Sequence, residues 1–234
     1  MALPKLETPI YELELPSTGE KVKYRPFLVK EQKNLMIAME SEEETQLRDS
    51  LASIISDCTF NKIDPYEIPM FDIEFIFLRI RGKSVGEKVK LNVLCPDDNK
   101  TRVDVEINLE DIDVHMKKEH TNEIRVTKDI KIVMRYPFLN DMVNITDKSD
   151  TTSVFAMIKR CISEIHDGDK VHNIIDISNK ELDEFLDNLS TKVFENLGEF
   201  FVSMPKVIHS VKVKNPKTKK TGVVEIEGIQ SFFG

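Results

Sequence analysis

The chain has 234 residues, enough for one large domain or two small ones with a substantial hydrophobic core. Apolar residues make up 40% of it and charged residues 32%, a composition that excludes a disordered chain. The 33 basic and 41 acidic residues leave a net charge of −8, which argues against a general affinity for nucleic acid or anionic membranes.

Cysteine spacing and hydropathy indicate the setting of the protein. Cys58, Cys95 and Cys161 are scattered and form no CxxC pair, so we expect a reducing compartment and no disulfide framework. The first residues lack the basic-then-apolar order of a secretion signal. No apolar run approaches the ~20 residues that span a membrane. We therefore expect neither secretion nor membrane insertion.

The first half of the chain predicts a hairpin, helices and further hairpins. Residues 1–27 alternate apolar and polar residues around the turn "PSTGE". Ser41 and Glu44 form a capping-box pattern before a helix at 47–58, and residues 71–81 predict a buried helix that ends near Gly82. A hairpin at about 86–108 and a short strand pair at 123–127 and 130–136 follow.

The second half predicts the same kinds of element. A helix begins near Thr151, and Ser178 with Glu181 forms a capping box before another. A helix at 191–204 precedes a second hairpin at about 207–228. The same five-position apolar spacing, typical of one helical face, occurs in both halves. The first set is Leu47, Leu51, Ile54, Ile55 and Cys58, and the second is Val154, Ile158, Cys161, Ile162 and Ile165.

These elements predict an α+β fold in which helical regions are combined with antiparallel hairpins. The division we expect is 1–148 and 149–234, although both parts can pack as a single domain. Aligning Pro96 with Pro216 also aligns Lys100 with Lys220, so the two hairpins are similar in turn chemistry. Either the chain contains a duplication, or two unrelated hairpins use the same turn.

The hairpin tips invite a comparison with zinc knuckles, which supply two closely spaced pairs of soft ligands. Here Cys95 is followed by Asp98, and Asn215 and Thr218 stand at the corresponding places of the second tip. We therefore predict no metal. The sequence also lacks a glycine-rich phosphate loop and the common hydrolase motifs, so we predict no cofactor and no catalytic residue.

Two features suggest contact with another protein. The second hairpin concentrates basic residues in an acidic chain, either as a solvated tip or as a docking point for an acidic surface. Large aromatic residues gather late in the chain, where they either complete the core or anchor into a partner. These residues are Lys212, Lys214, Lys217, Lys219 and Lys220, and Phe200, Phe201, Phe232 and Phe233.

Several blocks resemble the baseplate hub assembly proteins of T4-like tailed bacteriophages. They are "YRPFLVKEQKNLMIAMES" (24–41), "FLRIRGKSVGEKV" (77–89), "CPDD" (95–98), "FFVSMP" (200–205) and "GIQSFF" (228–233). The resemblance runs from the first strand to the last phenylalanine. It implies a virally encoded, non-enzymatic protein that is made in the cytoplasm of the infected bacterium.

The resemblance also implies partners, namely other baseplate hub or tape-measure proteins. Phe27 and Leu28, which follow the first hairpin, join the candidate contact residues. The protein would assist hub assembly and leave, or remain as a resident hub subunit of the virion. A hub-associated hydrolase lacks a recognisable motif. A nucleic-acid module lacks aromatic residues among its lysines. Oligomeric state stays open.

Overall fold

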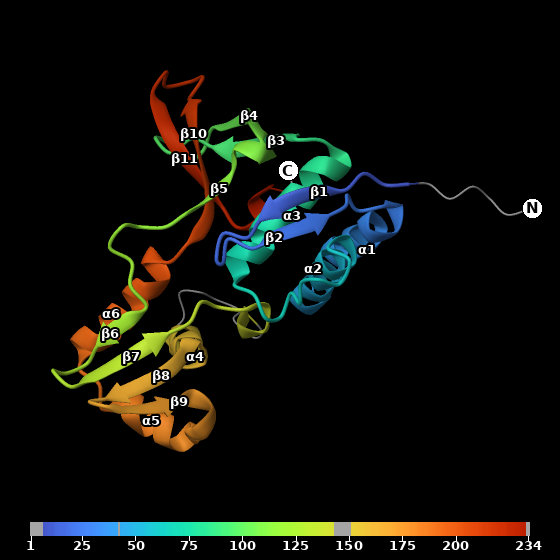
Figure 1. Ribbon diagram of the computed structural model, residues 1–234. Helices are drawn as coiled ribbons and strands as arrows, with labels where there is room; N and C mark the ends of the chain where they lie inside the picture. The colour runs from blue at the N-terminus through green and yellow to red at the C-terminus, as the bar shows by residue number, and fades with distance from the viewer. Residues whose placement is uncertain (1–6, 42, 143–150, 233–234) are drawn as a thin grey trace, which may run out of the picture. The chain divides into compact units, whose positions relative to one another are not determined.

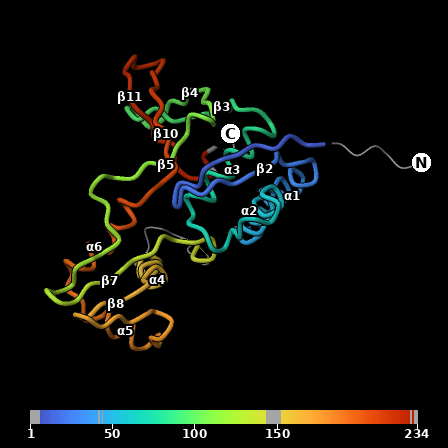
Figure 2. The backbone as a smooth tube through the Cα atoms, viewed as in Figure 1, coloured from blue at the N-terminus to red at the C-terminus, as the bar shows by residue number. Residues whose placement is uncertain are grey.

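The computed structural model describes residues 7–41, 43–142 and 151–232, and it confirms the α+β class (Figures 1 and 2). The chain forms two compact units. The first contains residues up to His115 and from Lys206 onward, and the second contains residues 116–205. The helices are α1 Val29–Glu40, α2 Glu44–Cys58, α3 Met70–Val85, α4 Thr151–Cys161, α5 Asn179–Asp187 and α6 Thr191–Ser203.

The strands pair in antiparallel fashion throughout the described chain. In the first unit they form two hairpins and one three-stranded sheet: β1 (Tyr11–Glu14) with β2 (Lys21–Tyr24), β3 (Lys88–Leu94) with β4 (Arg102–Asn108), and β11 (Thr221–Glu227), β10 (Lys206–Lys214) and β5 (Asp113–His115) in that order. The second unit has one four-stranded sheet of β6 (Glu123–Arg125), β7 (Ile130–Met134), β8 (Ile162–Asp167) and β9 (Lys170–Asn173).

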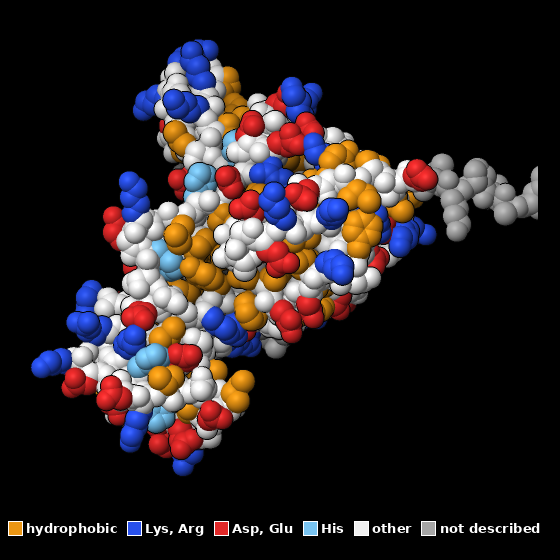
Figure 3. Space-filling view, viewed as in Figure 1, with side chains coloured by type: hydrophobic (Ala, Val, Ile, Leu, Met, Phe, Trp, Pro, Cys, Tyr) orange, Lys and Arg blue, Asp and Glu red, His pale blue; other side chains and the backbone are white. Residues whose placement is uncertain are grey.

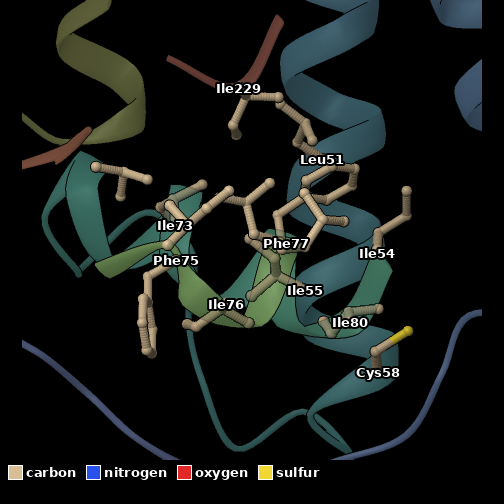
Figure 4. Packing of buried hydrophobic residues seen from close by; sticks show 14 of the residues in the cluster. Leu51, Ile54, Ile55, Cys58, Ile73, Phe75, Ile76, Phe77, Ile80 and Ile229 are labelled. Atoms are coloured by element: carbon tan, nitrogen blue, oxygen red, sulfur yellow. The ribbon is translucent and has the colours of Figure 1, made fainter. Parts of the chain in front are cut away.

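Each unit has its own hydrophobic core. In the first, α2 and α3 pack together, and Figure 4 shows Leu51 of α2 beside Phe77 of α3. Ile229, from the end of the chain, joins the same core and is 6% exposed. In the second unit, residues from the sheet and from α4, α5 and α6 share a core that includes Ile132 and Leu197, both fully buried. The units are thus separately packed bodies in the sense of a domain.

The limits of these units differ from the division at residue 148 that we expected from the sequence. The reason is a long-range strand pairing. Val207 of β10 lies opposite Val114 of β5, so the chain returns to the first unit after the second is complete. The hairpin at 206–227 therefore belongs to the same unit as the hairpin at 88–108, although residues 109–205 separate them in sequence.

Local signals predicted five of the six described helices, missed α1 and misplaced three boundaries. The end of α4 is one of them, because Ile162 and Ile165, expected on its apolar face, lie in strand β8. The Ser178–Glu181 capping box is present at the start of α5. Ser41, in contrast, is the C-terminal cap of α1, and its hydroxyl donates to the carbonyl of Ala38 (2.8 Å). The helix expected to end near Gly82 continues to Val85, because Gly82 lies inside α3 with a helical backbone.

A shared turn construction follows the first hairpin of each unit. The backbone N–H of Arg25 donates to the carbonyl of Cys58 at the end of α2, and its guanidinium binds the Glu31 carboxylate (2.8 Å). The equivalents in the second unit are Arg135, Cys161 and Asp141. After each of these turns the chain continues to a proline-lysine hairpin, and both hairpins belong to the first unit. The two halves of the chain thus share part of their element order.

Candidate docking surface at the paired hairpin tips

The β10–β11 hairpin carries the strongest concentration of positive charge that the sequence predicted. Figure 3 shows lysine side chains grouped around its tip. All five of these lysines are exposed: Lys212, Lys214, Lys217, Lys219 and Lys220. We call Lys217, Lys219 and Lys220, which lie in the turn itself, the basic tip. In a chain with a net charge of −8, it is a local reversal of sign.

Asn215 shapes the turn that carries the basic tip. Its side-chain oxygen accepts hydrogen bonds from the backbone N–H groups of Lys217 (2.8 Å) and Thr218 (3.2 Å), as asparagine does when it initiates a turn. Lys219 has a φ of +63°, and its N–H donates to the carbonyl of Asn215 (2.9 Å). Backbone bonds and one asparagine therefore define the turn without the lysine side chains.

The β3–β4 hairpin ends in a turn of the same construction. Asn99 has a φ of +49°, and its N–H donates to the carbonyl of Cys95 (3.0 Å). The Asp98 carboxylate accepts from the backbone N–H groups of Lys100 (3.0 Å) and Thr101 (2.9 Å) and from the Thr101 hydroxyl (2.7 Å). The similarity in turn chemistry expected from the two sequences is thus present in the backbone.

The two tips bind one another directly. The side-chain amide of Asn215 donates to both Asp97 (2.9 Å) and Asp98 (2.9 Å), and the Thr218 hydroxyl donates to Asp97. Asn215 is only 1% exposed, whereas Asp97 and Thr218 are exposed, so the junction lies at the surface and covers the Asn215 side chain. The backbone approaches closely as well, because a Cβ on Gly222 would overlap the ring of Pro96.

Hydrogen bonds keep both aspartates ionised. Bonds from Thr218 and then from Asn215 lower the pKa of the Asp97 carboxyl below its ordinary value. Backbone and side-chain bonds from Thr101, with Lys100 and Asn215, hold the pKa of Asp98 well below its usual range. Two fixed negative charges therefore lie at the junction of the tips, while the lysines remain at the surface.

The four positions compared with a zinc knuckle lie in these two turns and offer poor ligands. Cys95 is fully buried, and burial followed by the charges of Asp97 and Asp98 raises the pKa of its thiol. Asn215 and Thr218 contribute an amide and a hydroxyl, which bind the aspartates instead. Among residues 7–41, 43–142 and 151–232, no three His, Cys, Asp or Glu side chains are arranged to hold a metal ion.

The other two cysteines show no nucleophilic character. Burial raises the pKa of Cys58 and of Cys161 to about 12, and each side chain is fully buried. At neutral pH both are therefore protonated thiols packed in a core. No helix in the described ranges is long and apolar enough to cross a membrane.

The structure separates the expected aromatic contact residues into interior and surface positions. Phe27 (8% exposed) lies in the first core and Phe200 (1% exposed) in the second. The Phe200 ring stacks on Tyr136 with centroids 5.8 Å apart, and half-buried Phe201 meets Phe200 edge to face at 5.1 Å. Leu28, which is 41% exposed, is accessible. Phe27 and Phe200 therefore stabilise the units in this conformation.

The two C-terminal phenylalanines receive only partial description. A single 3-10 turn, Ile229–Phe232, ends the described chain. The Phe232 side chain and the whole of Phe233 lie outside the described residues. Their role as partner anchors therefore remains a prediction.

The sequence reasoning missed one exposed apolar surface, on α1. Val29 is 80% exposed, Met36 53% and Ile37 51%. A shallow open groove runs along this side of the helix and is lined by Val29, Gln32, Lys33, Met36, Ile37 and Glu40. The signal was present in the sequence, because apolar residues at i, i+7 and i+8 share one face of a helix.

Comparison with known proteins identifies the family of the chain. A family model described as T4 bacteriophage base plate protein matches residues 8–234. No curated protein and no solved structure matches the chain. The match covers both units and both hairpin tips. The chain therefore belongs to the T4 bacteriophage base plate protein family.

Proposed function

We propose that the protein is a non-enzymatic morphogenesis factor that assists assembly of the central baseplate hub by binding hub or tape-measure proteins. Membership of a baseplate family supports work in the phage tail. Assembly would begin in the cytoplasm of the infected bacterium. The observation that carries the proposal is the basic tip, a fixed group of positive charges on an acidic protein.

The chemistry of the tip indicates what it would bind. Lys217, Lys219 and Lys220 are exposed and adjoin Lys212 and Lys214 on the same hairpin. Such a group attracts an acidic protein surface and raises the rate of encounter more than it holds the complex. We therefore propose an acidic patch on a hub or tape-measure protein as its partner.

The tip is also pre-organised. Asn215 and Thr218 tie the basic hairpin to the aspartates of its neighbour, so little backbone freedom remains to be lost on binding. A rigid presentation of this kind lowers the entropic cost of association. Leu28 adds an exposed apolar contact, and Phe201, Phe232 and Phe233 are further candidates. Phe27 and Phe200 would first have to leave their cores.

Charge reversal of the basic tip tests the proposal. The variant K217E/K219E/K220E leaves Asn215 and Thr218 intact, so it should fold as the parent does. In cells that co-express the other hub and tape-measure proteins, we expect it to capture at least about tenfold less of its partner at low salt. The parent complex should weaken as salt rises, whereas the residual binding of the variant should not.

A matched control carries the same change of charge elsewhere. K118E/K128E/K170E reverses three exposed lysines of the second unit and should leave capture unchanged. Equal losses in both variants would show that net charge alone matters and would refute a role for the tip. Capture that survives K217E/K219E/K220E would refute it as well.

A resident hub subunit would use the same surface, so the two forms of the proposal need a separate measurement. Quantitative mass spectrometry of purified particles counts copies of the chain per tail. A departing assembly factor should be absent from finished particles and present in assembly intermediates. A whole number of copies in each finished baseplate would instead establish a resident subunit.

A further inference from the structure

The outward face of α1 carries large exposed apolar side chains, although the helix already buries its opposite face. Leu35 and Ala38 are buried against the first unit. On the other side, Val29, Met36 and Ile37 are at least half exposed along the groove. A surface helix normally carries polar residues there. Exposed apolar surface of this kind marks an interaction site.

Two charges lie along the centre of this face. Lys33 and Glu40 are seven residues apart, which places them on the same line of the helix about 10 Å from one another. That spacing is too long for them to pair within the helix. Neither forms an ion pair with any other residue that the structure describes, whereas the neighbouring Lys30 contacts Glu31 (3.2 Å) and Asp57 (3.6 Å).

The two charges are placed so that each would face the opposite charge in an antiparallel second copy of the helix. Met36 and Ile37 occupy the middle of the face, with Lys33 three residues before Met36 and Glu40 three residues after Ile37. A twofold axis between Met36 and Ile37 would bring an antiparallel second copy of the helix onto the first. Lys33 would then face Glu40 of that copy, and Glu40 would face its Lys33.

We propose that the outward face of α1 binds the same face of a second copy of this chain, forming an antiparallel, twofold-symmetric dimer. The arrangement is self-complementary in both apolar surface and charge, as an isologous interface requires. Met36 and Ile37 would pack at its centre, with two Lys33–Glu40 pairs on either side of the axis. This proposal is independent of the basic tip and of the partner proposed for it.

The dimer should be in measurable equilibrium with monomer. A 12-residue helix is only about 18 Å long, so the contact is smaller than a standard permanent interface. Sedimentation equilibrium of the whole chain should therefore show a weight-average mass that rises with concentration from one chain of 27.0 kDa toward two. A monomer at every concentration up to about 1 mM, in the range of the weakest specific complexes, would overturn the proposal.

Charge-reversal variants test the antiparallel pairing itself. K33E places glutamates opposite one another in both pairs, and E40K places lysines there. Each single variant should dimerise at least about tenfold more weakly than the parent. When the two are mixed, every pair regains opposite charges, so a heterodimer should form. The double variant K33E/E40K should likewise dimerise with itself.

The controls change equal charges on a different surface. K128E and E119K alter exposed residues of the second unit, and neither should change the dimer or create one on mixing. Because Lys33 and Glu40 are exposed, their reversal should leave the thermal midpoint unchanged, which excludes misfolding as the cause. A dimer that tolerates both single reversals would overturn the proposal. So would single variants that remain monomeric when they are mixed.

Discussion

The Asn215 side chain makes four hydrogen bonds at the hairpin tips. It accepts two backbone hydrogen bonds within its own turn and donates two to the aspartates of the other. Replacement by alanine removes all four and leaves backbone N–H groups of Lys217 and Thr218 without their acceptor. We predict that Asn215→Ala lowers the free energy of unfolding by about 1–3 kcal/mol, measured by urea denaturation.

A matched asparagine provides the comparison. Asn122 is exposed, and Asn122→Ala should stay within about 0.5 kcal/mol of the parent. If Asn215→Ala is equally mild, the bonds between the tips contribute nothing net to stability. In that case the basic tip would not be held in place by its neighbour.

The aspartates at the junction predict how this stability depends on pH. Their folded pKa values are lowered, so they favour the folded state at pH values above the unfolded pKa of about 3.9. The contribution is lost as pH falls through that value toward the folded pKa. It should be constant between about pH 6 and 8, because neither group titrates there.

Asp98→Asn isolates the effect. The variant should be less stable than the parent at pH 7, and the difference should shrink steadily as the pH is lowered from about 5 toward 2. Urea denaturation at a series of pH values measures both. A difference that stays constant down to pH 3 would contradict an ionised Asp98 in the folded state.

At the scale of elements, the close approach of the two hairpins depends on glycine. A side chain on Gly222 would overlap Pro96 of the opposite hairpin, so Gly222→Ala must push the tips apart or distort β11. We predict a loss of about 1–3 kcal/mol in unfolding free energy. Gly198 lies inside α6 with open space around it, and Gly198→Ala should raise stability by up to about 1 kcal/mol. The opposite signs distinguish a packing constraint from a general effect of alanine.

Helix ends that depend only on neighbouring residues could be predicted from the sequence. A helix end could not be predicted where one capping residue lies between two helices. The Ser178–Glu181 capping box appears as expected, because Ser178 directly precedes α5 and its hydroxyl accepts from the backbone N–H of Glu181. Ser41 fits the same pattern but lies between two helices, where its hydroxyl caps the first. The pattern alone does not say which helix the serine serves.

The sequence predicted which residues form the candidate site, but it did not predict that the two hairpin tips bind one another. The lysines and both turns are visible in the sequence, and one of the compared pairs, Asn215 and Asp98, is in direct contact. That Asn215 binds Asp97 and Asp98 across more than a hundred residues is a tertiary fact, which no local spacing encodes. The exposed apolar face of α1 could be recognised from the sequence only after residues 29–40 were known to form a helix.

For the whole molecule, the limits of the units follow from one pairing that sequence patterns do not reveal. β5 is only three residues long, too short to be recognised by alternation of apolar and polar residues. Its antiparallel pairing with β10 makes the end of the chain part of the first unit. The sequence gives no signal that Val207 pairs with Val114. The expected boundary was therefore placed at residue 148.

Separate cores also decide how Phe200 should behave. It is 1% exposed within the second unit, and its ring stacks on Tyr136 and approaches His120 at 5.2 Å. Phe200→Ala should therefore lower the unfolding free energy by about 3–5 kcal/mol, as the removal of a buried aromatic ring does elsewhere.

In hydrogen exchange, the protection of backbone amides in Phe200→Ala should fall in residues 116–205 and remain in β3 and β4. Phe77→Ala should do the reverse, because Phe77 is fully buried in the first core. A Phe200→Ala protein of parental stability that fails to capture its partner would contradict the core position and make Phe200 a docking residue.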